Sequence, residues 1–286
     1  MRGLILNLIK TVKIEKKEIQ KYLALQGPKR VKKFFEHRYL TENCGAKYDL
    51  AEEWLTYLIK LENDGYVVIP NSFALVADKI LENLDIEKLN SFNDETHVID
   101  YCFDLGFSFP GIFNLMSNKE LCSLLCNFFG RQALYRNHPQ IISHSRGVDT
   151  LKRSSEFSHI DGYKQLTMFL LLSDMNETTS QLYIYPNSHK TKSYTYNRSI
   201  RIDQSKQFEN VLGITAQKGD LVIFNSGSLW HKGLSRESRR LILNIIITTG
   251  WIPTPDSENY DSDYLKINLK GMPEYVSKCF TGFFPV

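Results

Sequence analysis

Two side chains that can bind a metal share one short stretch of the chain, Phe157-Ser158-His159-Ile160-Asp161-Gly162. Side chains alternate between the two faces of a strand, so on an extended backbone His159 and Asp161 point to the same face. A neutral imidazole and a carboxylate supply two of the three ligands of a non-haem Fe(II) centre, which needs a second histidine and keeps positions open for substrates. The stretch therefore predicts an iron site if another histidine returns beside it.

A candidate for that second histidine follows 72 residues later. His231 stands in Ser228-Leu229-Trp230-His231-Lys232-Gly233, after the turn signal 218–220 and the apolar strand 221–224. The interval is long enough for several strands, so His231 can return beside His159. The catalytic and metal-binding set would then be His159, Asp161 and His231 on one face of a six-coordinate Fe(II), with the opposite positions left for a bidentate 2-oxo acid and O2.

A 2-oxo acid such as 2-oxoglutarate brings a distal carboxylate, and a buried carboxylate needs a paired cation. Arginine suits this role because its planar fork makes two parallel hydrogen bonds. Arg239 and Arg240 stand at the start of the apolar segment 241–246, immediately after the region of His231. By strand alternation one of the two faces the interior and the other faces out, and parity does not say which.

Along the sequence, segments with a helical pattern come first and segments with a strand pattern follow. Gly65 is suited to end the first helix in the left-handed conformation, and a β-branched strand follows it. Many short strands separated by turn residues favour a sandwich or barrel over βαβ units. Residues 90–115 and 252–286 are expected to be irregular, and residues 187–212 to form a long polar loop. The expected helices are 51–61, 73–89 and 119–129, and the expected strands are 66–69, 140–145, 157–161, 166–172, 181–185, 213–216, 220–225 and 241–248.

The charge of the chain is unevenly distributed. The formal net charge is +3, yet residues 1–40 carry eleven Lys/Arg and three Glu, a net charge of +8, and the remainder has a net charge of −5. This basic segment has an amphipathic helical pattern, and we expect residues 1–45 to form an N-terminal extension to a domain of residues 46–286. Peripheral attachment to an anionic membrane is one interpretation. The other is a helix that packs on the domain with a solvated lysine face.

The five cysteines are odd in number and scattered, which does not indicate a disulfide framework. Cys122 and Cys126 lie one helical turn apart among leucines and are expected to be buried free thiols. No run of eighteen apolar residues occurs, so no transmembrane helix is expected. We expect a cytoplasmic protein that does not bind nucleic acid; the oligomeric state is not defined by the sequence.

Six motifs occur in a consistent order across residues 50–250. Together they resemble the phytanoyl-CoA dioxygenase (PhyH-like) family of Fe(II)/2-oxoglutarate-dependent oxygenases. One departure lies at Asn187, where the family usually has glycine in a turn; asparagine also tolerates positive φ. Residues 1–50 and 252–286 show no such resemblance. The six motifs are residues 64–70, 159–162, 185–190, 218–224, 229–233 and 239–241.

The resemblance implies a mainly β fold with N-terminal helices and a double-stranded β-helix (jelly-roll, cupin-like) core. It implies Fe(II) bound by His159, Asp161 and His231, and 2-oxoglutarate anchored by an arginine; the usual register of the family favours Arg239, with Arg240 as the alternative. Members that halogenate lack the carboxylate ligand. Because Asp161 is present, the resemblance favours hydroxylation or a related oxidation of a C–H bond, with release of succinate and CO2.

Three further residues are candidate substrate contacts. His144 and Arg146 lie on or after the strand 140–145, which can line the pocket of a jelly roll or form an exposed edge, and Tyr163 follows the ligand pair. The substrate class that we expect is a small molecule or a lipid or saccharide-type compound. Two other functions use the same sequence features: a Zn²⁺ hydrolase with the same His/Asp/His site, and a non-catalytic binding module anchored to a membrane or a partner.

Overall fold

A computed structural model of the 286-residue chain describes residues 47–85, 101–136, 139–144, 158–161, 165–190, 210–234, 238, 240–249 and 262–280. The basic segment 1–45 lies outside the described residues. The division into an extension and a single domain of residues 46–286 therefore stays a prediction.

The described chain begins with the helix and strand that the sequence predicted. Helix α4 (Glu52–Asp64) ends at Gly65, whose φ of 81° is in the left-handed region and whose N–H donates to the carbonyl of Leu61. Only glycine adopts this conformation without a steric penalty. Strand β1 (Tyr66–Ile69) follows at once, so the sharp turn places the first strand directly beside the helix that precedes it.

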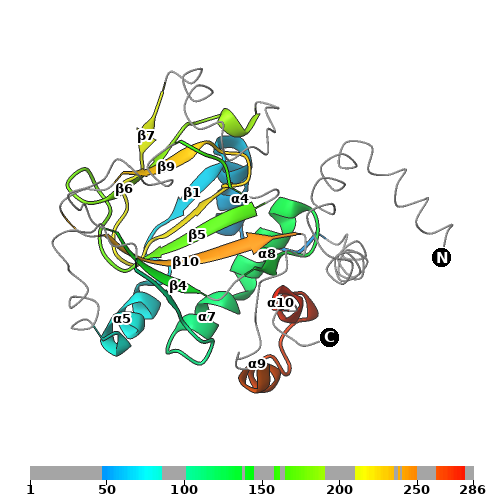
Figure 1. Ribbon diagram of the computed structural model, residues 1–286. Helices are drawn as coiled ribbons and strands as arrows, with labels where there is room; N and C mark the ends of the chain where they lie inside the picture. The colour runs from blue at the N-terminus through cyan, green and yellow to red at the C-terminus, as the bar shows by residue number, and fades with distance from the viewer. Residues whose placement is uncertain are drawn as a thin grey trace, which may run out of the picture.

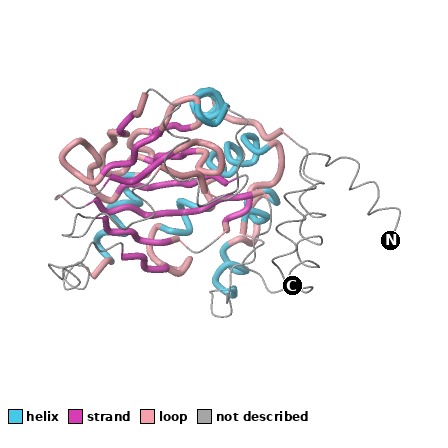
Figure 2. Tube along the Cα trace, turned by 45° about the horizontal axis from the view of Figure 1, so that its top comes forward, coloured by secondary structure: helices cyan, strands magenta, loops and turns pink. Residues whose placement is uncertain are grey.

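Within the described residues, ten strands form two antiparallel sheets. Figures 1 and 2 show how the sheets are arranged. The large sheet has the order β1-β8-β5-β10-β4-β2, with β3 also paired to β10. The small sheet has the order β7-β6-β9. This arrangement is the double-stranded β-helix core that the sequence predicted. The remaining strands of the large sheet are β8 (Leu221–Phe224), β5 (Gln165–Leu171), β10 (Arg240–Thr248), β4 (Gln140–His144), β2 (Tyr101–Asp104) and β3 (Leu134–Tyr135), and those of the small sheet are β7 (Leu212–Gly213), β6 (Gln181–Ile184) and β9 (His231–Leu234).

Alternation along the strands of the large sheet divides its apolar side chains between two cores. On β5, Leu166, Met168 and Leu170 pack in the core shared with the helices, whereas Leu171 packs in the core between the two sheets. Strand β10 repeats the pattern, with Ile242 in the core between the sheets. Side chains on this inner face are thus directed toward the small sheet, which is the position that a site inside a jelly roll requires.

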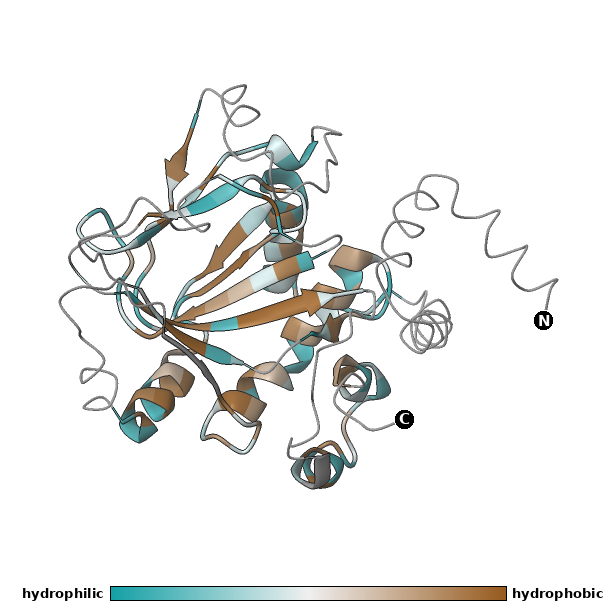
Figure 3. Ribbon diagram, in the orientation of Figure 1, coloured by the Kyte–Doolittle hydropathy of each residue, from teal (hydrophilic) through white to brown (hydrophobic). Residues whose placement is uncertain are grey.

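Helices cover the other face of the large sheet (Figure 1). Their brown and teal sides in Figure 3 show the amphipathic pattern of helices packed on a core. Helix α8 is capped by Asn118, whose side chain accepts a hydrogen bond from the N–H of Leu121. The helices are α5 (Ala74–Asn83), α7 (Ile112–Met116), α8 (Lys119–Phe129), α9 (Ser262–Asn268) and α10 (Glu274–Cys279).

Two expectations about irregular segments were wrong. Residues 90–115 contain β2 and the start of α7, and residues 252–286 contain α9 and α10. Both segments are rich in aromatic residues whose burial depends on distant partners: Phe107 and Phe113 pack on Phe280. Such contacts between distant segments leave no periodic pattern in either segment.

The cysteines behave as expected in the described part of the chain. Cys122, Cys126 and Cys279 are buried free thiols. Among the described residues, no helix combines the length and the apolar character needed to cross a membrane.

Candidate metal centre

His159 and His231 face each other across the edge of the small sheet. Their backbones form an isolated antiparallel bridge, with His159 N–H donating to the carbonyl of His231 (2.9 Å) and His231 N–H donating to that of His159 (3.1 Å). Directly opposed residues in such a pair carry their side chains on the same side. The two imidazole centroids accordingly lie 4.4 Å apart, although 72 residues separate the histidines in sequence.

Asp161 joins this pair as alternation along the chain predicted. Its N–H donates to the carbonyl of Ser226 (2.8 Å), which fixes the backbone two residues after His159. Its Oδ1 lies 3.5 Å from His159 Nε2 and its Oδ2 lies 3.7 Å from His231 Nε2. One ligand atom from each of the three residues lies within 4.8 Å of the others.

The hydrogen bonding and burial of His231 select the form of imidazole that binds metals. Its Nδ1 lies 2.9 Å from the carbonyl oxygen of Leu229, and because a carbonyl only accepts, Nδ1 carries the proton. The lone pair is then on Nε2, which lies 3.7 Å from Asp161 Oδ2. Burial lowers the pKa of His231 to about 4, with a further contribution from His159 and an opposing one from Asp161. His231 is therefore neutral at neutral pH, the form that ligates a metal.

The donor set fits a divalent transition metal. The carboxylate–imidazole separations of 3.5 and 3.7 Å are below the limit of about 4.2 Å for two donors that each bind one metal at about 2.1 Å, and one ligand atom from each of the three residues lies within 4.8 Å of the others. Two imidazoles and one carboxylate form the facial triad of non-haem Fe(II), and the same set also serves zinc. His159 and Asp161 keep about 30% of their side-chain surface exposed while His231 keeps 6%, so the site is accessible from one side.

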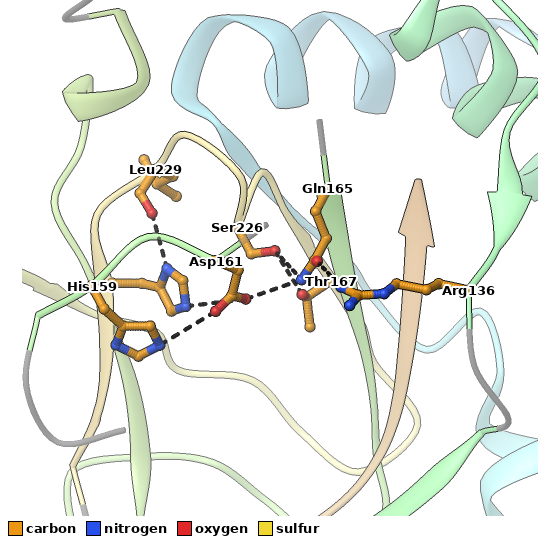
Figure 4. A network of polar contacts seen from close by, with 8 residues as sticks. Arg136, His159, Asp161, Gln165, Thr167, Ser226 and Leu229 are labelled. Atoms are coloured by element: carbon orange, nitrogen blue, oxygen red, sulfur yellow. Dashed lines mark hydrogen bonds and ion pairs between the residues drawn. The ribbon is translucent and has the colours of Figure 1, made fainter. Parts of the chain in front are cut away.

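A chain of polar residues supports Asp161 from the inner face of the large sheet (Figure 4). Gln165 Nε2 donates to Asp161 Oδ2 (3.2 Å) and to Ser226 Oγ (3.2 Å). Thr167 Oγ1 bonds to Ser226 Oγ (2.8 Å), and Arg136 Nη1 donates to Gln165 Oε1 (2.8 Å). The carboxylate is thus held by groups from β5, from the segment after β8 and from the residue after β3.

Of the two predicted arginines, the structure describes Arg240. It is the first residue of β10 and has the same parity as Ile242, whose side chain lies between the sheets. It is 4% exposed, its Nη1 lies 3.3 Å from Met175 Sδ, and its guanidinium lies over the Phe169 ring at 5.8 Å from the centroid. Phe169 contacts Phe224, which contacts the ring of His231. A series of ring contacts therefore connects the buried guanidinium to the histidine.

The other candidate residues are only partly described. His144 lies on β4 directly opposite Arg240 in the strand register. Arg239, Arg146 and Tyr163 lie outside the described residues. Their roles, like those of the metal ligands and Arg240, stay predictions.

The polar groups of the inner face were not predicted from the sequence. Gln165, Thr167 and Ser226 are buried, and Asn244 on β10 is 7% exposed with its Nδ2 3.4 Å from Gln140 Oε1. A signal was present: Gln165 and Thr167 alternate with the apolar Leu166 and Met168 in a strand that is otherwise apolar. Alternating polar residues on a strand buried on both faces indicate a polar interior rather than solvent.

Comparison with known proteins identifies the fold. No family model matches the chain, and no curated protein matches its sequence. Among solved structures, the epimerase SnoN in complex with Fe3+, alpha ketoglutarate and nogalamycin RO aligns with a TM-score of 0.52 and 13% identity over 73% of this chain and 91% of SnoN. AviO1 from Streptomyces viridochromogenes Tue57 aligns with a TM-score of 0.50 and 15% identity over 72% of this chain and 100% of AviO1. At these identities the likeness concerns the fold, which SnoN shares while binding iron and alpha-ketoglutarate.

Proposed function

We propose that this chain is a PhyH-like Fe(II)/2-oxoglutarate-dependent dioxygenase that hydroxylates a C–H bond of its substrate and releases succinate and CO2. The observation that carries the proposal is the convergence of His159, Asp161 and His231, with one ligand atom of each within 4.8 Å of the others, inside a double-stranded β-helix. This donor set leaves one face of a six-coordinate metal open for a co-substrate and O2.

Each of these residues has a defined role in the proposal. His159, Asp161 and His231 would hold Fe(II), which supplies O2 activation coupled to the decarboxylation of 2-oxoglutarate. Leu229 holds the His231 ring in the tautomer that turns Nε2 toward the metal position. Ser226 holds the backbone of Asp161 at a fixed distance from the histidine pair.

Arg240 is the residue that we propose as the anchor of 2-oxoglutarate. The guanidinium is buried between the two sheets on a strand of the core, so a dicarboxylate would meet a positioned, two-pronged donor. Phe169 and Phe224 lie between Arg240 and His231 and provide an apolar wall. Such a wall excludes water and strengthens the attraction between the guanidinium and a carboxylate.

The substrate class and the site of action are proposals that rest on the sequence. A small molecule, or a lipid or saccharide-type compound, fits the PhyH-like resemblance, with His144, Arg146 and Tyr163 as candidate contacts. Peripheral attachment of a cytoplasmic protein to a membrane surface through residues 1–40 follows from their net charge of +8.

The test is anaerobic reconstitution with Fe(II), followed by addition of 2-oxoglutarate and then of air. We expect a weak visible metal-to-ligand absorption band with the co-substrate and succinate formation after air is admitted. Asp161→Ala should abolish both signals, whereas Asp78→Ala, which removes an exposed carboxylate paired with Lys218, should retain them. The absence of band and succinate with folded wild-type protein would contradict the proposal and favour a non-catalytic module. Hydrolysis that depends on Zn²⁺ would favour the hydrolase that the same donor set permits.

A further inference from the structure

The side chain of Gln165 lies between a guanidinium and the metal-facing carboxylate (Figure 4). Its Oε1 accepts from Arg136 Nη1 at 2.8 Å, and its Nε2 donates to Asp161 Oδ2 at 3.2 Å. Gln165 is only 2% exposed, and its own carbonyl accepts from the N–H of Gly227 (2.9 Å). Both the backbone and the amide of this residue are therefore held in place.

The chemistry of the two neighbours determines which way the amide points. Arg136 can only donate hydrogen bonds, and the Asp161 carboxylate can only accept them. The oxygen of the amide must therefore face Arg136 and its nitrogen must face Asp161, because the reverse orientation would lose both bonds. Ser226 Oγ receives the second hydrogen of the same Nε2 (3.2 Å), so both donors of the amide are used.

The same contact fixes one oxygen of a carboxylate that faces both histidines. Gln165 binds Oδ2, which also lies 3.7 Å from His231 Nε2, and Oδ1 lies 3.5 Å from His159 Nε2. A carboxylate held by one oxygen cannot rotate freely about its Cβ–Cγ bond. Asp161 would otherwise have that freedom, because about a third of its side-chain surface is exposed.

We propose that Gln165, oriented by Arg136, is the positioning residue for the Asp161 carboxylate and holds it in the orientation that faces His159 and His231. This inference rests on the proposed function, because it concerns the metal that His159, Asp161 and His231 would hold. The positive guanidinium polarises the amide carbonyl, which makes the amide N–H a stronger donor to the carboxylate. Groups that hold a ligand in this way typically contribute about 10- to 100-fold to metal affinity.

Three substitutions test separately the hydrogen bonds that connect Arg136, Gln165 and Asp161. Gln165→Leu removes both hydrogen bonds and keeps a side chain of similar size. Gln165→Glu keeps the bond to Arg136 and places a second carboxylate oxygen against Asp161. Arg136→Leu keeps Gln165 and removes the group that orients it. We expect each to weaken metal binding, Gln165→Leu by about 10-fold or more.

The measurement is equilibrium binding of Co²⁺ to the folded full-length chain, followed by its visible absorption, which reports the ligand geometry without turnover. In the wild type we expect saturable binding with one metal per chain, and in Gln165→Leu a higher Kd together with an altered spectrum. Arg136→Leu should raise the Kd in the wild-type background and have little further effect in the Gln165→Leu background, because it acts through the amide.

Gln181→Leu is the matched control. Gln181 is a glutamine of β6 that is 1% exposed and donates from Nε2 to the carbonyl of Ile214 (3.1 Å), away from the triad. Its replacement should leave the Co²⁺ Kd and spectrum unchanged even if stability falls. Equal Kd and spectrum for wild type and Gln165→Leu would overturn the positioning role. Failure of wild-type protein to bind Co²⁺ or Fe(II) would instead overturn the proposed function, so the two failures are distinguishable.

Discussion

At the scale of single residues, the candidate site depends on how each ligand is held as much as on its identity. Two backbone hydrogen bonds join His159 and His231, and these bonds fix the distance between the two imidazole rings. Asp161 has no strand partner and is held by Ser226 and Gln165 instead. The carboxylate is therefore the ligand whose geometry depends most on its surroundings.

Arg240→Lys tests the proposed anchor of 2-oxoglutarate. Lysine keeps the charge but loses the planar fork, so one of two parallel hydrogen bonds to the distal carboxylate is lost. A hydrogen bond to a charged group contributes about 1.5–3 kcal/mol. We expect the KM for 2-oxoglutarate to rise by at least about 10-fold, measured by succinate formation, because a tenfold change corresponds to about 1.4 kcal/mol. The Kd for Co²⁺ should not change, because Arg240 is not a proposed metal ligand.

Arg131→Lys is the control substitution. Arg131 follows α8 on the helix-covered side of the large sheet, so this substitution should leave the KM for 2-oxoglutarate unchanged. An unchanged KM in Arg240→Lys would contradict the assignment. The same substitution at Arg239, the residue favoured by the family register, would then be expected to raise it.

At the scale of helices and strands, the hydrophobic pattern of a segment predicted a strand correctly where burial of that segment's own side chains stabilises the strand. The apolar runs of β8 and β10 were predicted because both faces of these strands are buried, and the β-branched run of β1 because Val67 and Ile69 are buried and Val68 is half-buried. Strand β9 was not predicted, because Lys232 and Gly233 have low strand propensity. Its pairing with β6 and with His159 overrides that propensity.

The contact between Arg136 and Gln165 could not have been predicted in the same way. The two residues are 29 positions apart and belong to no spacing pattern. Arg136 reaches the site because its N–H pairs with the carbonyl of Ile246 on β10, so its position depends on the register of the assembled sheet. The convergence of His159, Asp161 and His231 could be predicted from strand alternation together with the family resemblance, whereas the groups that support Asp161 depend on tertiary structure.

Gly65→Ala tests the turn that joins α4 to β1. The residue has φ 81°, and a Cβ built on it would lie 2.6 Å from His189 Nδ1. Gly130 ends α8 with φ 62°, but a Cβ there meets nothing within 4 Å. Both substitutions incur the left-handed penalty of about 1–2 kcal/mol, and only the first also displaces a neighbour. In urea unfolding, we expect Gly65→Ala to lose more stability than Gly130→Ala by about 1 kcal/mol or more.

His189→Ala provides the check on that explanation, because it removes the ring that the new methyl group would displace. In the His189→Ala background the difference between the two glycine substitutions should become smaller. Leu229 Cδ1 lies 3.0 Å from the same Cβ position, so an unchanged difference would show that Leu229 or the backbone of the turn, and not the imidazole, is responsible.

At the scale of the whole molecule, the charge distribution separates the N-terminal segment from the part that carries the site. Residues 1–40 have a net charge of +8 and the remaining chain has a net charge of −5. The proposed metal ligands and Arg240 all belong to the acidic part. Metal binding and membrane attachment would therefore be functions of different segments, and each can be tested without the other.

Removal of residues 1–40 tests the membrane proposal. Each basic residue near an anionic surface contributes about 1 kcal/mol, so the full-length chain should sediment with phosphatidylserine-containing liposomes at low ionic strength, and the truncated chain should not. Binding should fall as salt is added, because screening weakens the attraction, and liposomes of phosphatidylcholine alone should bind neither form. The truncated chain should keep the wild-type Kd for Co²⁺. Equal liposome binding by both forms, or a truncated chain that fails to fold, would favour the other interpretation, in which the basic helix packs on the domain with its lysines in solvent.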